Sequence, residues 1–164
     1  MKSERKLFAG ALLATAGVVT PLAAHAAGAS CWIFLPAHVP PLLAGLALGP
    51  VAGLVTGGAT ALADLLWGGR VQGMAFLPIA VELVAYGLVA GLLSRRSGAY
   101  GARLVALLGA MLVGRLAYLV AAIALGQTAA KVLPGLFVLP WPGMFIQVVA
   151  LPLASRMVER WSEA

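Results

Sequence analysis

The stretch FLPIAVELVAYGLVAGLL, residues 76–93, decides the fold class because Glu82 is its only charged residue. A helix needs roughly 20 consecutive apolar residues to cross the hydrocarbon core of a bilayer. With the two residues before it, this stretch has that length. It predicts a transmembrane helix over residues 74–93.

The composition of the whole chain extends this prediction. Of 164 residues, 62% are hydrophobic and 10% are charged, whereas soluble domains average roughly 45–50% apolar and about 25% charged residues. So few charges cannot build a water-facing surface, so most of the surface is expected to face lipid. The length allows five or six crossings and no separate soluble domain, so we expect one membrane domain over residues 1–164.

Similar apolar segments recur along the chain and predict an all-α bundle of six transmembrane helices joined by short loops. Besides 74–93, the expected spans are 7–24, 39–49, 51–67, 102–125 and 136–155.

The first segment has a second interpretation. Basic residues precede it and Ala24-His25-Ala26 follows it, which is also the layout of a cleaved signal peptide. Cleavage would leave an odd number of spans.

The second and third segments also have an alternative, because residues 41–67 are one long apolar run with Gly49-Pro50 in its middle. Proline removes a backbone donor and disfavours helix at the residue before it. We therefore expect two short spans with a tight turn between them, and a single kinked helix is the competing interpretation.

Basic residues predict the orientation, because Lys and Arg accumulate on the cytoplasmic side of membrane proteins. Six spans with a cytoplasmic N-terminus place eight basic residues inside and two outside. The inner set is Lys2, Arg5, Lys6, Arg95, Arg96, Arg103, Arg156 and Arg160, and the outer set is Arg70 and Lys131. Five spans would put Arg95 and Arg156 on opposite sides. We expect a multi-pass protein of a bacterial-type cell membrane with both termini cytoplasmic.

Two ionisable residues, Glu82 and Arg115, lie deep inside predicted spans. Each is twelve residues from the cytoplasmic end of its helix, at Ser94 and Arg103 respectively, so both lie roughly 18 Å deep on neighbouring antiparallel helices. Charges inside a membrane are costly and usually functional. The two residues are therefore expected to meet, either in a solute site or in an ion pair that only locks two helices.

Four further residues are candidates for the same site. Tyr86 and Tyr118 follow the two charged residues by four and three positions, on the same helix faces. His38 stands between two prolines at the outer end of its span, where it is either structural or part of a lid. Trp141, also flanked by prolines, is a stacking candidate or part of an interfacial aromatic belt.

The sequence lacks the motifs that mark several classes of enzyme and metal site. It has no phosphate loop, no Ser-His-Asp set and no metal-binding cluster, so we expect no enzyme, no cofactor and no metal. The single cysteine, Cys31, cannot form an internal disulfide. The net charge of +6 is explained by span ends, so nucleic-acid binding is not expected.

Three stretches together resemble the substrate-binding S components of energy-coupling factor (ECF) transporters. LPAHVPPLLAG at residues 35–45, with LGP at 48–50, resembles "LPMHIPVLLAGxxLGP" in that family. ELVAYGLVAGL at 82–92 resembles "FELxxYGLxxGLL", and GRLAY at 114–118 resembles "GRLxY". The departures are Ala37, where the family pattern has Met, and Pro41, where it has Val. Neither touches a charged position.

The resemblance implies a six-helix protein that binds a vitamin or vitamin precursor near the outer face. Family members dock on a transmembrane coupling protein and two cytoplasmic ATPases. Residues 32–38 would cover the solute, with Arg115 on a carboxylate or carbonyl, Glu82 on an amine or hydroxyl, and Tyr86, Tyr118 and Trp141 stacking. Gly10 and Ala14 would contact the coupling protein, or would pack within the bundle.

The runner-up function is a non-catalytic membrane scaffold, such as the small polytopic protein of the rod-shape machinery. A scaffold needs no occupied polar pocket. The sequence does not identify the solute, although a pantothenate-like acid suits a single deep arginine.

Topology reporters test the sixfold threading. Reporters fused at either end are expected to show a cytoplasmic location for both, because the basic residues segregate eight to two. Ends on opposite sides, or a mature protein that begins near residue 27, would contradict it.

Overall fold

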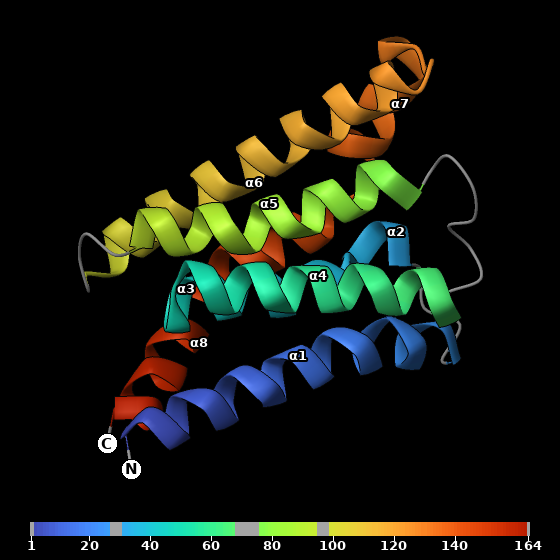
Figure 1. Cartoon of the computed structure of the whole chain (residues 1–164). Coiled ribbons are helices and arrows are strands. Elements are labelled where there is room, and N and C mark those ends of the chain that lie inside the picture. Colours follow the sequence, from blue (N-terminus) through green and yellow to red (C-terminus); the bar gives the residue numbers. More distant parts are fainter. Residues whose placement is uncertain (1, 27–30, 68–75, 95–98, 164) are drawn as a thin grey trace.

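The computed structural model describes residues 2–26, 31–67, 76–94 and 99–163, and these residues form helices and turns without a sheet. Their order along the chain is α1 (Lys2–Ala26), α2 (Cys31–Phe34), a 3₁₀ turn (Pro36–His38), α3 (Val39–Leu48), α4 (Pro50–Trp67), α5 (Phe76–Ser94), α6 (Tyr100–Ala124), α7 (Ala129–Leu133), a π-helical turn (Pro134–Val138) and α8 (Trp141–Glu163). The long helices lie side by side in a bundle (Figure 1). The all-α prediction is confirmed for these ranges.

Among the described residues, three helices, α5, α6 and α8, are long and apolar enough to cross a membrane. Shorter apolar helical stretches cover Pro36–Leu48, Pro50–Leu66 and Ala129–Val138. Large apolar side chains such as Leu12, Val105 and Phe145 are exposed on the outside of the bundle. This surface suits a multi-pass membrane protein, because lipid tails, unlike water, accept it.

The chain reverses at Gly49, as the Gly-Pro pair predicts. Gly49 has φ 99°, a value that glycine adopts without steric cost, and α4 begins at the next residue. A methyl group at either Gly45 or Gly53 would collide with the carbonyl oxygen of Gly87. In one continuous helix these two glycines would be about 12 Å apart. Their common neighbour therefore excludes the single kinked helix.

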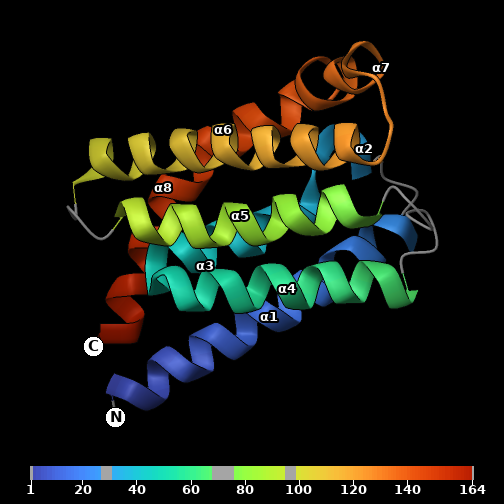
Figure 2. The ribbon, with the colours of Figure 1, turned by 45° about the horizontal axis from the view of Figure 1, so that its top comes forward.

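Helix α5 is the centre of the bundle. It lies between the α3–α4 hairpin and α6 in both ribbon views (Figures 1 and 2). Backbones approach very closely where Gly87 meets Gly53 and where Gly91 meets Pro50, a packing that membrane helices achieve with small residues. The main apolar core is formed by α3, α5, α6 and α8 and consists of Leu42, Leu46, Tyr86, Ala90, Ala106, Leu107, Ala110, Met111 and Leu151.

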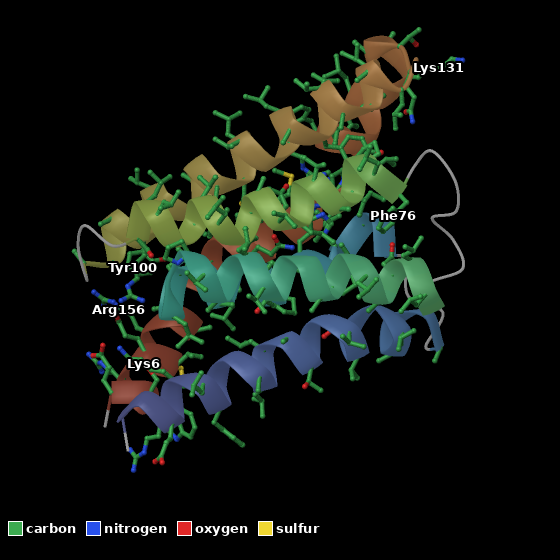
Figure 3. All side chains as sticks on the ribbon, viewed as in Figure 1. Lys6, Phe76, Tyr100, Lys131 and Arg156 are labelled. Carbon is green, nitrogen blue, oxygen red and sulfur yellow. The ribbon has the colours of Figure 1, made fainter. Side chains whose placement is uncertain are left out.

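Both termini lie at the same end of the bundle (Figures 1 and 2). Lys6, Tyr100 and Arg156 are at that end, whereas Phe76 and Lys131 are at the opposite end (Figure 3). Lys6 and Arg156, predicted to be inner, therefore lie at the end of the bundle opposite Lys131, predicted to be outer.

The predicted last span, 136–155, has wrong boundaries. Helix α8 begins at Trp141 and continues to Glu163. Residues 136–139 are apolar for a different reason: Leu136 packs against Val132 of α7 and Ala122 of α6, so the chain folds back on α6 before it enters α8. Residues 131–135, which lie between the predicted spans 102–125 and 136–155, are helical as well.

Replacing Gly87 by Ala tests the close packing. The added methyl group would meet the backbone of Gly53, and such overpacking costs typically 1–3 kcal/mol. We expect a lower melting temperature in detergent. Gly58→Ala is the matched control, because nothing lies within 4 Å of that added methyl. Equal melting temperatures for the two variants would contradict this packing.

Candidate functional site

The two deep charges meet. Arg115 Nη1 of α6 lies 2.8 Å from Glu82 Oε1 of α5, and the residues are 3% and 2% exposed. Their equal depth in antiparallel helices predicted this contact. At such burial the attraction is strong, but each charge has also lost its water, so the pair needs further hydrogen bonds to be stable.

Tyr86 and His38 complete a buried polar cluster around the Glu82 carboxylate. The Tyr86 hydroxyl donates to Glu82 Oε1 at 2.9 Å, and His38 Nε2 lies 3.5 Å from Glu82 Oε2. The His38 and Tyr86 rings meet edge to face, with centroids 5.3 Å apart. Gly114 leaves the space that the Tyr86 ring occupies between α5 and α6. We call these four side chains — Glu82, Arg115, Tyr86 and His38 — the polar cluster.

The segment before α3 holds His38 over the cluster. Leu35 adopts φ 50° and ψ 48°, a left-handed conformation that is uncommon for a residue other than glycine. Its carbonyl accepts hydrogen bonds from the His38 backbone N–H at 3.1 Å and from Gln147 Nε2 of α8 at 3.3 Å. Gly143 lets the start of α8 approach the Ile33 carbonyl. Helix α8 therefore supports the turn that carries His38 at two points, Gly143 and Gln147.

The polar cluster and its surroundings leave several polar atoms without a hydrogen-bond partner among the residues described. They are Arg115 Nε and Nη2, His38 Nδ1 and Nε2, and Gln147 Oε1. An unsatisfied buried polar group costs about 1–3 kcal/mol, and a charged one more. Most buried polar groups in folded proteins are paired, so this concentration in one place marks a site with unused binding capacity.

Two predicted site residues lie outside the polar cluster. Tyr118 is half-buried and packs against the apolar cluster of Ala122, Val132 and Leu136. Trp141 is 64% exposed at the start of α8. Both positions suit contact with lipid or with a solute that approaches from the outer end, and neither residue hydrogen-bonds to Glu82 or Arg115 in the structure.

The residues predicted to contact a coupling protein lie on the flank of α1. Gly10 is half-buried, with Leu48 of α3 nearby, and Ala14 is half-buried too. The face that packs into the bundle is Ala9, Leu13 and Gly17, which are buried. Gly10 and Ala14 thus pack partly within the bundle and leave the rest of their surface accessible.

A third buried charge, Arg103, was not predicted from the sequence. The sequence places Arg103 at a cytoplasmic span end, but in the structure it is only 2% exposed. It donates to Ser155 Oγ at 3.0 Å and forms an ion pair with Glu159. The signal was the spacing of Ser155 and Glu159, which share a helix face once the last helix extends past residue 155. This contact joins α6 and α8 near the two termini.

No protein family, curated protein or solved structure matches this chain. The parts of the chain that the structure describes contain no group of three metal-ligating side chains. What remains is a charge-balanced cluster of hydrogen-bonding groups within an apolar bundle, which is suited to hold a small polar molecule.

A double-mutant cycle tests the ion pair. Glu82→Gln leaves Arg115 charged and buried, and Arg115→Gln does the same to Glu82, so each should lower the free energy of unfolding in detergent by about 3–5 kcal/mol. The double variant should recover part of that loss. Lys6→Gln, which breaks the exposed contact with Glu163, should change little. Strictly additive losses would show that the two charges are not coupled.

Proposed function

We propose that this chain is the substrate-binding subunit of an ECF-type importer in a bacterial-type cell membrane. It captures a vitamin or vitamin precursor at the outer face, and a separate coupling protein with two cytoplasmic ATPases drives its release inward. The observation that carries the proposal is the polar cluster, in which Glu82 and Arg115 meet deep in apolar helices. Intramembrane charges that face a bundle interior are by default functional.

The topology of the proposed subunit is six crossings with both termini cytoplasmic. Both termini lie at one end of the bundle (Figure 2), an arrangement that supports an even number of crossings. Helix α3 has ten residues, about 15 Å of helix, or half of the roughly 30 Å hydrocarbon core. The segment from α2 to His38 would complete this crossing above α3.

The short α3 explains how a solute could reach the polar cluster. His38, which ends the turn just before α3, contacts Glu82 in the middle of α5, so residues 31–38 lead directly to the cluster. Movement of this segment would open the cluster toward the outer face. Arg115 would then bind a carboxylate or carbonyl, and Glu82 an amine or hydroxyl. A pantothenate-like acid is one candidate solute.

The predicted contacts of Tyr118 and Trp141 fit a solute that approaches from the outer face. Tyr118 lies three residues, or about one turn, beyond Arg115 toward the outer end of α6. Trp141 begins α8 at the same end of the bundle. Each would present its ring to the less polar part of the solute during entry.

The proposed partner proteins would supply the ATP hydrolysis for which this sequence has no motif. Its sequence has no phosphate-binding loop, so uptake against a gradient needs ATPases from elsewhere. The accessible flank of α1 at Gly10 and Ala14 permits close approach of a partner helix, and exposed Leu7 and Leu12 lie beside it.

A membrane scaffold is the second candidate, favoured by the closed state of the cluster. The 2.8 Å ion pair joins α5 to α6, and this role alone would rigidify a bundle whose function is to hold partners. A scaffold retains no solute, which separates the two candidates experimentally.

Mass spectrometry of ligand released from the purified protein tests the proposal. We expect a vitamin-sized molecule in stoichiometric amount, and Arg115→Ala should lose it because the variant removes the guanidinium of the cluster. Tyr118→Phe, which keeps the ring, serves as the folded control. Absence of any bound molecule and a failure to bind added vitamins would favour the scaffold.

A further inference from the structure

Arg115 uses only one part of its guanidinium in the closed cluster. Nη1 faces Glu82, whereas the buried Nε and Nη2 have no hydrogen-bond partner in the part of the chain that the structure describes. These two nitrogens form one edge of the planar group, and their N–H bonds point the same way. That edge matches the two oxygens of a carboxylate, which arginine binds in a bidentate manner.

The charges of Glu82 and Arg115 limit how a carboxylate can bind in the polar cluster. Glu82 and Arg115 neutralise each other, so one added carboxylate would leave a net charge of −1 deep in an apolar bundle. An uncompensated buried charge is strongly unfavourable. A proton taken up by the cluster together with the anion removes the imbalance.

His38 is the group placed to take that proton. Its Nε2 lies 3.5 Å from Glu82 Oε2, so a protonated imidazole would face an acceptor that Arg115 and Tyr86 leave free, since both bind Oε1. From α8 the neighbouring side chain is the uncharged Gln147, bound to the Leu35 carbonyl. Helix α1 also packs against the turn that carries His38; its residues 7–24 have no ionisable group, and His25 follows them in the sequence.

We propose, on the basis of the function proposed above, that the solute carries a carboxylate which binds the Nε–Nη2 edge of Arg115 while His38 takes up one proton. The cluster thereby binds the equivalent of a neutral acid. Arg115 determines the specificity for the carboxylate, and His38 links its binding to pH. A water-soluble acid and the head of a fatty acid share this chemistry, so the probes must separate them.

Matched acid and neutral probes test the solute class. Binding to the full chain in nanodiscs is measured by calorimetry at about pH 6 for pantothenate and panthenol, nicotinate and nicotinamide, biotin and biotin amide, with oleate as the lipid acid. We expect one water-soluble acid to bind about 10- to 100-fold more tightly than its neutral partner, the range for hydrogen bonds to a charged group. Binding of oleate alone would overturn the assignment to a water-soluble acid.

The outcomes separate this inference from the proposed function. A neutral solute bound as tightly as its acid, or a co-purified molecule without a carboxylate, would overturn the inference and leave the uptake function standing. A protein that retains no solute and binds none of the probes would overturn both.

Two conservative variants test the individual roles. Arg115→Lys keeps the positive charge beside Glu82 but lacks the two-nitrogen edge, so the acid should bind about 10- to 100-fold more weakly. Arg103→Lys makes the same change at another buried arginine, which pairs with the half-buried Glu159, and should leave acid binding unchanged. Equal effects of the two variants would overturn the role of the Arg115 edge.

The pH profile tests His38. Histidine is the side chain that ordinarily titrates between about pH 5 and pH 8. If one proton binds with the acid, affinity in the wild type should fall as pH rises through this range, by up to about tenfold per pH unit. His38→Gln keeps a donor near Glu82 without titrating, so its weaker binding should not vary with pH. A wild-type slope that persists in this variant would assign the proton elsewhere, and a flat wild-type profile would overturn the linkage.

Discussion

The contact between Glu82 and Arg115 is the constraint on which the rest of the site depends. Each charge would be costly alone in an apolar bundle, so α5 and α6 must adopt the register that joins Oε1 to Nη1 at 2.8 Å. This register also brings Tyr86 to the carboxylate and its ring to Gly114. The pair thus organises two helices and, through Tyr86, part of the apolar core that packs around it.

A second constraint, the close packing of glycines, brings α3 and His38 to the Glu82–Arg115 pair. Gly45 and Gly53 both abut Gly87, so the two arms of the α3–α4 hairpin lie against the middle of α5. Because α3 has only ten residues, its first turn reaches no farther than Glu82. His38 contacts the carboxylate for this reason, and the segment before it must fold over the cluster.

Helix α8 contacts the rest of the bundle both near the termini and near the turn that carries His38. Near the termini, Ser155 and Glu159 bind Arg103 of α6. Toward the other end, Gln147 binds the Leu35 carbonyl, and Gly143 lies against the Ile33 carbonyl. The first contact is an ion pair between the buried Arg103 and the half-buried Glu159, and the second is one neutral hydrogen bond to a residue in an uncommon backbone conformation. The second is therefore the weaker, which fits a proposed subunit that opens outward while α6 and α8 stay joined near the termini.

The sequence by itself determined the helical class, the break at Gly49 and the meeting of Glu82 with Arg115. These features follow from local quantities: runs of apolar residues, the conformational limits of the Gly-Pro pair, and depth counted at a fixed rise per residue. It also suggested His38 as a lid residue, but gave no reason for contact with Glu82 Oε2.

Only the tertiary structure decided which apolar residues cross the bundle and which fold back onto it. Leu136 reads as part of a span, but it packs on α6, and α8 begins five residues later. The sequence suggests that Arg103 is a surface charge, but in the structure it is buried and pairs with the half-buried Glu159 of α8. The type of an apolar or charged residue does not indicate which residue it will contact. The partner depends on where a distant segment lies after the helices have packed, and a local pattern holds no information about that.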